Sequence, residues 1–259
     1  MKDFSVTMVV GATNEVESLK QTVRYIMSHC PTDEIDRILI VYAKNAPADS
    51  RRVIRELEEE FPGKVYGMEQ TRPHVGGAIR DGFDTAVSSH ILLLPGDLAI
   101  GLDAAPRLFE AEKKAPEGIV KTSRWLKKDA FHGYRRVRKG LNALAQSFLR
   151  LLYHSRLTDL TNPVQIMPTE LYQSIDWREL NFPFLAEMVL CPLRLGAVFT
   201  EIPADCRGRK EGKSSNSFLQ TALYLRTALR IRFTPKTRLV KSCQDEQRAV
   251  SPARGDKQQ

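Results

Sequence analysis

The sequence has few cysteines, and none is spaced as in a common metal site. Its 259 residues include four cysteines that form no CxxC pair, namely Cys30, Cys191, Cys206 and Cys243. Its five histidines show no metal-ligand spacing either. This pattern argues against a structural zinc site and against a small disulfide scaffold. We therefore expect free thiols in a reducing compartment.

Long apolar runs are also missing. No stretch reaches the roughly 18 consecutive apolar residues that a membrane-spanning helix requires. The first ten residues are too short and too strand-like for a secretory signal, and no internal repeat is visible. We therefore expect a cytoplasmic protein, either free or attached peripherally to the inner face of a membrane.

Negative charge is in deficit. The formal net charge is +8 and the isoelectric point is near 9.4, which favours an anionic partner such as a nucleotide, a phosphorylated lipid, a membrane surface or a nucleic acid. The basic residues lie in separate loops, and no recognised nucleic-acid-binding module with interleaved aromatic residues is present, so a nucleic acid is the least favoured of these. A hydrophobic content of 42% is typical of a globular domain with a sizeable core.

The first hundred residues alternate apolar runs with segments of helical periodicity. Buried strands are predicted at 4–10, 35–42, 64–68 and 91–94. Helices are predicted between them, most clearly at 48–61 and from 76 to about 86. This alternation is typical of a parallel, doubly wound sheet.

The second half has a less regular pattern. Helices are predicted at 102–111, 142–153, 168–175 and 184–195. Strands are predicted at 118–124, within 159–167 and at 197–202. Residues 126–139 predict a basic loop, and the polar tail is expected to be disordered.

Asp97 follows directly on a buried strand. The apolar run at 91–94 stops at Pro95 and Gly96, and Asp97 comes just beyond them. Ligands of open α/β sheets bind at the carboxyl ends of the strands. Asp97 is therefore a candidate site residue, with a helix-capping turn as the alternative.

Several motifs occur in a characteristic order. They are VVGATNE at 9–15, GGAIRDGF at 76–83, LLLPGDL at 92–98, KTSRW at 121–125, DLTN at 159–162, FLAE at 184–187 and RGRKEGKSS at 207–215. Together they resemble the motifs of GT-A fold, family 2 glycosyltransferases, and among these the dolichyl- or polyprenyl-phosphate sugar synthase-like branch. The resemblance extends over residues 4–233.

This resemblance implies an α/β protein with a GT-A fold, a Rossmann-like, mostly parallel central sheet flanked by helices. The glycosyltransferase-like domain would span 1–233. Its parts would be a nucleotide-sugar-binding half at 1–100, an acceptor half at 101–215 and a basic amphipathic helix at 216–233, followed by a basic tail at 234–259.

The resemblance also implies an inverting transfer of a sugar from a nucleotide-sugar donor to a polyprenyl phosphate or another membrane-linked acceptor. A lipid phosphate is ionised near neutral pH, so it needs no general base. A soluble or glycan acceptor is an alternative. So is a non-catalytic nucleotide-sugar-binding or scaffold protein, and a homo-oligomer is left open.

The donor site implied by the resemblance has lost several acidic residues. Asp97 occupies the position of the last carboxylate of a D-x-D motif, where it would be the catalytic residue and a ligand of Mg²⁺ or Mn²⁺. Pro95 occupies the position of the first carboxylate. One carboxylate makes a weak site for a hard cation. Tyr42 and Ala43 stand where two acidic residues usually contact the nucleotide. The implied donor-binding residues are Gly11, Ala12, Thr13, Glu15, Tyr42, Ala43, Gly76, Gly77 and Asp97.

The acceptor site implied by the resemblance is mostly basic. Its residues would be Arg124, Arg135, Arg136, Asp159, Glu187, Arg207, Arg209, Lys213 and Ser214. Arginine suits bidentate contact with a phosphate. The alternatives are a solvated surface position for each single cation, a turn cap for Asp159 and a buried ion pair for Glu187.

Two segments predict helices with an apolar stripe. In residues 218–233 the stripe comprises Phe218, Leu219, Ala222, Leu225, Ala228 and Leu229. Arginines lie beside it, as in helices that bind an anionic membrane surface. Packing on the domain or in a dimer is the alternative, and residues 142–153 form a second candidate of the same kind.

Overall fold

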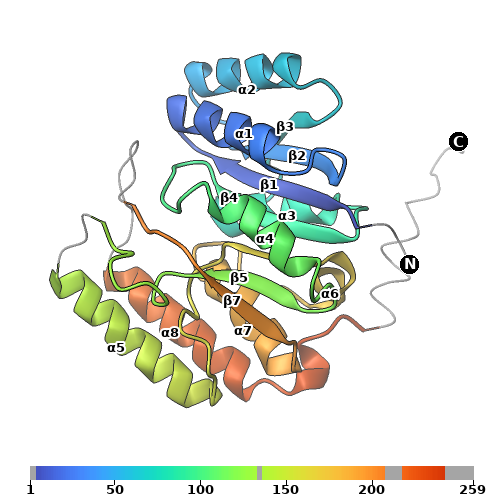
Figure 1. Ribbon diagram of the computed structural model, residues 1–259. Helices are drawn as coiled ribbons and strands as arrows, with labels where there is room; N and C mark the ends of the chain where they lie inside the picture. The colour runs from blue at the N-terminus through green and yellow to red at the C-terminus, as the bar shows by residue number, and fades with distance from the viewer. Residues whose placement is uncertain (1–3, 133–135, 208–217, 243–259) are drawn as a thin grey trace, which may run out of the picture.

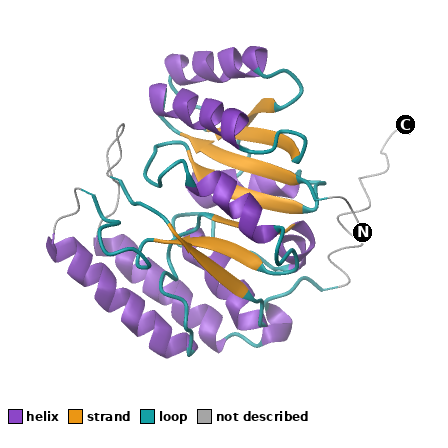
Figure 2. Cartoon of the chain, viewed as in Figure 1, coloured by secondary structure: helices purple, strands orange, loops and turns teal. Residues whose placement is uncertain are grey.

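A computed structural model describes residues 4–132, 136–207 and 218–242. These residues build one seven-stranded sheet with helices on both faces (Figure 1, Figure 2). The strands are β1 (Val6–Ala12), β2 (Ile35–Tyr42), β3 (Val65–Glu69), β4 (His90–Pro95), β5 (Ile119–Ser123), β6 (Gln165–Pro168) and β7 (Phe199–Pro203). Their order in the sheet is β3-β2-β1-β4-β6-β5-β7.

The helices cover the sheet in two layers. They are α1 (Glu17–His29), α2 (Ala48–Glu60), α3 (His74–Asp84), α4 (Ala104–Glu112), α5 (Arg136–Tyr153), α6 (Thr169–Ser174), α7 (Phe184–Leu195) and α8 (Phe218–Phe233), with a short 3-10 helix at Lys236–Arg238. One core cluster joins the sheet to α1, α2 and α4. The other joins it to α3 and to α5 through α8.

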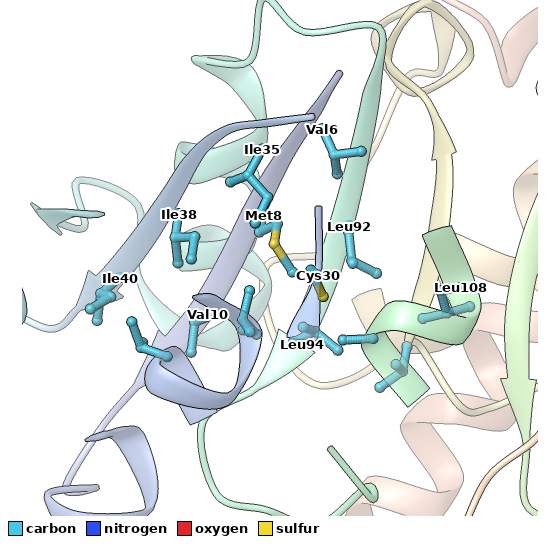
Figure 3. Close-up of a cluster of buried hydrophobic side chains, with 14 of the residues drawn as sticks. Val6, Met8, Val10, Cys30, Ile35, Ile38, Ile40, Leu92, Leu94 and Leu108 are labelled. Atoms are coloured by element: carbon cyan, nitrogen blue, oxygen red, sulfur yellow. The ribbon is translucent and has the colours of Figure 1, made fainter. Parts of the chain in front are cut away.

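The first four strands are parallel, and their side chains alternate between the two cores. Val6, Met8 and Val10 of β1 belong to the α1 side together with Leu92 and Leu94 of β4 (Figure 3). Val9 of β1 and Leu93 of β4, which alternate with them, belong to the opposite cluster. Because both faces are covered by helices, these strands are apolar on both sides, as parallel sheets usually are.

The second half of the sheet mixes directions. β6 runs antiparallel to its two neighbours, β4 and β5, while β7 is parallel to β5. The sheet is therefore mostly parallel and flanked by helices, which confirms the predicted fold class.

The structure differs from the sequence prediction at the start of α5. This helix begins at Arg136, so residues 136–139 are helical although they were expected in a basic loop. The apolar spacing of α5 continues back to Val137 across Arg138 and Lys139. Both of these are good helix formers. Basic composition alone is thus a poor sign of a loop.

Two expectations about the surroundings of the chain concern its cysteines and its helices. The described cysteines Cys30, Cys191 and Cys206 are buried thiols. None of the described helices is long and apolar enough to cross a bilayer.

Candidate functional site

The carboxyl ends of β1, β2 and β4 meet at one edge of the sheet. Gly11 pairs in register with Val41 of β2 and with Pro95 of β4, and Ala12 pairs with Tyr42. The chain order reverses at β1, because β2 and β3 lie on one side and β4 on the other. Such a switch point is where open α/β sheets bind ligands.

Asp97 lies in a tight turn just past this edge. It is 6% exposed, and its Oδ1 accepts a hydrogen bond from the amide of Ala99 at 3.0 Å. The next residue, Leu98, has a φ of 58°, a left-handed conformation that is costly for leucine. A Cβ on Gly96 would lie 2.9 Å from the carbonyl oxygen of Gly11, so the turn needs glycine there.

The turn after β1 is organised by Glu15. Its Oε2 accepts hydrogen bonds from the amides of Thr13 at 2.5 Å and Asn14 at 2.9 Å. The carboxylate therefore holds the loop itself in shape. Beside it, a Cβ on Gly11 would meet no atom within 4 Å, which leaves open space over the end of β1.

The loop after β2 is held by backbone and arginine contacts. Tyr42 is half-buried and packs against the α1-side core. The carbonyl of Ala43 accepts a hydrogen bond from Ala46 at 2.8 Å, and Arg51 donates to the carbonyls of Lys44 and Ala46. Arg51 is a structural residue that the sequence analysis did not single out.

The two glycines that open α3 are close-packed. A Cβ on Gly76 would lie 2.6 Å from the Cβ of Phe184, and one on Gly77 would lie 2.7 Å from the Cβ of Arg72. The amide of Gly77 donates to the carbonyl of Leu180 at 3.0 Å. These contacts explain the glycines by helix–loop packing, and a donor contact at them stays a prediction.

A second group of predicted residues forms a buried ion pair. Arg124, which follows β5, donates from Nε to Oδ2 of Asp159 at 2.6 Å and from Nη2 to Oδ1 at 2.8 Å. Asp159 is fully buried. Burial alone would raise the pKa of the Asp159 carboxyl, but the Arg124 guanidinium outweighs it and brings that pKa to about 2. The pair is therefore ionised at neutral pH.

Polar side chains from three further elements surround this pair. Gln146 of α5 donates to Asp159 Oδ1 at 3.2 Å and to Thr161 Oγ1 at 2.7 Å. The buried amine of Lys121 donates to the carbonyl of Asp159 at 2.5 Å, and burial lowers the pKa of that amine. Glu201 of β7 accepts from the amide of Asp159 at 3.0 Å. Lys121, Gln146 and Glu201 were not predicted as a group, although a lysine inside an apolar strand is a usable sign of such a cluster.

Glu187 of α7 also lies in a buried ion pair. Its Oε1 accepts from Nη2 of Arg230 on α8 at 2.7 Å, and its Oε2 accepts from the amide of Glu179 at 2.9 Å. Burial raises the pKa of Glu187, and the hydrogen bond from Arg230 opposes this shift. This is the alternative that the sequence left open for Glu187, and it joins α7 to α8.

Arg207 is brought next to the Asp97 turn. Its amide donates to the carbonyl of Ala99 at 2.9 Å, and the amide of Gly101 donates to the carbonyl of Asp205 at 3.0 Å. A cavity of about 250 Å³ lies here, bounded by Gln21, Tyr25, Leu98, Ile100, Gly101, Leu102, Asp103 and Arg207. Two predicted site segments, far apart in the chain, thus meet at one cavity.

Some predicted acceptor residues cannot be placed. Arg135, Arg209, Lys213 and Ser214 lie outside the described residues. Arg136 begins α5, and its side chain is likewise not described.

No known family model matches the sequence. Solved structures, however, share its architecture. Glucosyl-3-phosphoglycerate synthase from Mycobacterium tuberculosis, in complex with Mn²⁺, UDP and phosphoglyceric acid, superimposes with a TM-score of 0.65 at 14% identity over 90% of this chain and 80% of that chain. The fold is the GT-A fold.

Other structures show the same GT-A likeness. The Mycobacterium tuberculosis synthase with Mn²⁺, UDP-glucose and phosphoglyceric acid gives a TM-score of 0.65 at 14% identity, covering 90% of this chain and 81% of that one. Another mycobacterial protein gives 0.66 at 13% identity, covering 91% and 77%. At such identities the similarity establishes the GT-A fold and does not establish the activity, the donor or the acceptor of this chain.

The two synthase structures contain Mn²⁺, but the described part of this chain offers few ligands for such an ion. Within residues 4–132, 136–207 and 218–242, no three His, Cys, Asp or Glu side chains gather closely enough to hold an ion. Asp97 offers one carboxylate, whose Oδ1 already accepts the Ala99 amide, and Pro95 takes the place of a second. Hard cations need several oxygen ligands. The described residues thus do not fit a resident Mg²⁺ or Mn²⁺.

Proposed function

We propose that this protein is an inverting glycosyltransferase that moves a sugar from a nucleotide-sugar donor to a polyprenyl phosphate or another membrane-linked acceptor at the cytoplasmic face of a membrane. The observation that carries the proposal is the convergence at the β1–β4 switch point. There the end of β1 pairs with β4, and just beyond β4 the Asp97 turn, through Leu98, and Arg207 meet at a cavity. This is the expected place for a nucleotide ligand in such a sheet.

The reaction needs little acid–base help. An ionised phosphate oxygen of the acceptor attacks the anomeric carbon of the sugar, and the bond from that carbon to the donor diphosphate breaks. The nucleoside diphosphate leaves with the electron pair. A single in-line displacement inverts the anomeric centre. Cationic side chains such as Arg207 would stabilise the charge that develops on the leaving diphosphate.

Arg124 is the proposed anchor of the acceptor phosphate. Asp159 and Thr161 hold it in one orientation, and Gln146 in turn donates to Asp159, so little side-chain entropy is lost when an anion binds. The Mycobacterium tuberculosis structures contain phosphoglyceric acid, which is also a phosphate. An acceptor phosphate is therefore the chemistry shared by the lipid and the soluble alternatives.

A non-catalytic nucleotide-sugar-binding protein is the second candidate. It is favoured by the single carboxylate at Asp97, with Pro95 in place of another, and by Tyr42 and Ala43 at the end of β2. This candidate predicts nucleotide binding without turnover.

Thermal stability in the presence of nucleotides tests donor binding. A nucleoside diphosphate at 100 times its dissociation constant should stabilise the fold by about 2.7 kcal/mol. UDP, GDP, CDP and ADP would be compared, each with Mn²⁺ and with a chelator. We expect one of them to raise Tm in at least one condition, and Asp97→Asn to reduce that shift. Asp49→Asn, an exposed change on α2, should leave it intact. A chain that responds to no nucleotide under either condition is not a sugar-nucleotide transferase.

Release of the nucleoside diphosphate separates the candidates. With nucleotide sugars of the base identified by the Tm shifts as donors, release should require polyprenyl phosphate and should be absent without acceptor. Release with 3-phosphoglycerate alone would establish the soluble alternative. Binding without release on any phosphate acceptor would establish the non-catalytic one.

A further inference from the structure

Helix α5 exposes an unusual amount of apolar surface. Val137, Leu141, Leu144, Phe148 and Leu151 are each between 43% and 76% exposed. We call these five residues the α5 stripe. They follow each other at intervals of four and three residues, so they lie on one face of the helix. Single exposed apolar residues are common, but a continuous stripe marks an interaction surface.

The opposite face of α5 is the one that packs on the domain. Gln146 and Leu149 are buried, and Gln146 reaches the loop that carries Asp159. The α5 stripe therefore does not take part in the hydrophobic core of this chain. It lies on the outer layer of the molecule, where α5 and α8 run beside one another (Figure 1).

Neither helix of this layer contains an acidic residue. α5 contains Arg136, Arg138, Lys139 and Arg150 and no acidic residue. On α8, Arg226 is exposed and Arg232 is half-buried, whereas the charge of Arg230 is paired with Glu179 and Glu187. A second copy of the chain docked on the α5 stripe would bring cations against cations. An anionic surface would meet both the apolar stripe and the charge.

Helix α8 strengthens the same layer. The Tyr153 hydroxyl donates to the carbonyl of Ala228 at 2.7 Å, and Arg232 Nε donates to the carbonyl of Leu152 at 2.7 Å. These bonds fix the end of α5 against α8, which itself exposes Leu225, Leu229 and Phe233. Ala228 of α8 faces inward, so only part of the stripe predicted for residues 218–233 remains outside.

We infer that the α5 stripe docks this protein onto an anionic lipid bilayer, with α5 lying in the headgroup plane. Helices with one apolar face and basic flanks bind membranes in this way, and the binding grows with apolar area and with anionic lipid content. This inference names the surface that the membrane-linked acceptor would require, so it rests in part on the proposed function.

Docking through α5 also explains where the acceptor site lies. The same helix that carries the α5 stripe on its outside holds Asp159 from its inside through Gln146 at 3.2 Å. Arg124 is bound to Asp159. A headgroup phosphate at the membrane surface would thus be one helix away from the proposed acceptor anchor.

Vesicle flotation of the full chain tests the docking surface. The probes are phosphatidylcholine vesicles with and without phosphatidylglycerol, each at low and high salt. We expect flotation with the anionic vesicles at low salt and less at high salt. The double variant Leu144→Glu, Leu151→Glu changes two exposed positions and should bind at least about tenfold more weakly. The matched controls Val87→Glu and Val198→Glu change equally exposed valines outside α5 and should float like the wild type.

Several results would overturn the inference. One is a wild type that stays unbound at low salt, and another is a double variant that binds as well as the controls. A third is a wild-type dimer in solution that the double variant converts to a monomer without any flotation, which would assign the stripe to a second copy. Nucleotide-induced Tm shifts, measured without vesicles, report on the proposed function separately. A failure of one therefore does not imply a failure of the other.

Discussion

The polar residues of the candidate sites make different kinds of contact in the two halves of the molecule. At the ends of β1 and β4, Glu15 and Asp97 accept hydrogen bonds from nearby backbone amides, beside open space and a cavity. After β5, Arg124 and Asp159 bind each other inside a network of side chains. In the first half the carboxylates bind the backbone of the loops where we propose that the donor binds, whereas the second half holds its charged groups with other charged and polar groups. Substitutions in the second half should therefore cost more stability.

The largest effect is expected at Asp159. Asp159→Ala leaves the Arg124 guanidinium, whose side chain is 14% exposed, without its carboxylate. Removing one partner of a buried pair should lower the free energy of unfolding by about 3–5 kcal/mol. Urea unfolding measures this.

The matched control removes both charges. The double variant Arg124→Met, Asp159→Leu should recover much of the lost stability, because the guanidinium is removed together with its carboxylate. A single variant that costs less than about 1 kcal/mol would show that this pair does not hold the second half together.

The second-largest effect on the free energy of unfolding is expected at Glu112, at the junction between the two halves. Glu112 of α4 is fully buried, its Oε2 accepts the amide of Val120 at 3.1 Å, and His90 of β4 lies 3.4 Å from its Oε1. Burial raises the pKa of Glu112 to about 8, against the opposing hydrogen bond from Val120. The folded state thus favours the neutral carboxyl. Its contribution is complete below the ordinary pKa of a glutamate and is lost as the pH rises to about 8.

The expected loss over that range is on the order of a few kcal/mol. Glu112→Gln stays neutral and should flatten the dependence, which unfolding at a series of pH values would reveal. Burial lowers the pKa of His90, so the effect of His90 on the free energy of unfolding occurs at acidic pH. Equal pH profiles for the variant and the wild type would contradict a neutral Glu112.

A smaller effect is expected at the glycines of α3. In Gly76→Ala the new methyl group would lie 2.6 Å from the Cβ of Phe184 and 2.8 Å from the backbone of Leu180. Overpacking of this kind costs about 1–3 kcal/mol. Gly140→Ala is the control, because a Cβ there meets nothing within 4 Å and alanine favours a helix by about 1 kcal/mol. Tm should fall for the first variant and rise slightly for the second.

The smallest effect on stability is expected at Asp97. In Asp97→Asn the side-chain oxygen can still accept the Ala99 amide, so the free energy of unfolding should change by less than about 1 kcal/mol. Nucleotide binding should nevertheless weaken, as the Tm shift measures. If Asp97→Asn lowers the free energy of unfolding but still binds the nucleotide as the wild type does, Asp97 has a structural role, as Asp159 has in the other half.

The sequence predicted the elements best where an apolar run has clear ends. Helix α7 has the predicted bounds 184–195, and β4 differs from the predicted strand by one residue at each end. The direction of β6 was beyond sequence reasoning, because a buried strand of four residues carries no sign of its orientation. The early start of α5 was missed because its first turn is basic.

The candidate site was predictable in part. Asp97 became a candidate because it follows a strand that ends abruptly, and the motifs made Arg124 and Asp159 candidates; their roles in binding stay predictions. Their contact could not be found, because 35 positions separate them and no local pattern pairs them. The buried contact of Gln146 with Asp159 was not predictable, because a single amide side chain in an amphipathic helix such as α5 usually lies on the surface.

The antiparallel strand β6 has a consequence for how the chain folds. β1 to β4 can pair in the order in which they are synthesised, whereas β5 finds its sheet neighbours only when β6 and β7 have followed it. Until then the free edge of β4 and the whole of β5 expose unpaired backbone groups, which invite aggregation. The N-terminal half should therefore fold first, during synthesis, and the Arg124–Asp159 pair should be among the last contacts to form. Refolding of the full chain should be slow and sensitive to protein concentration.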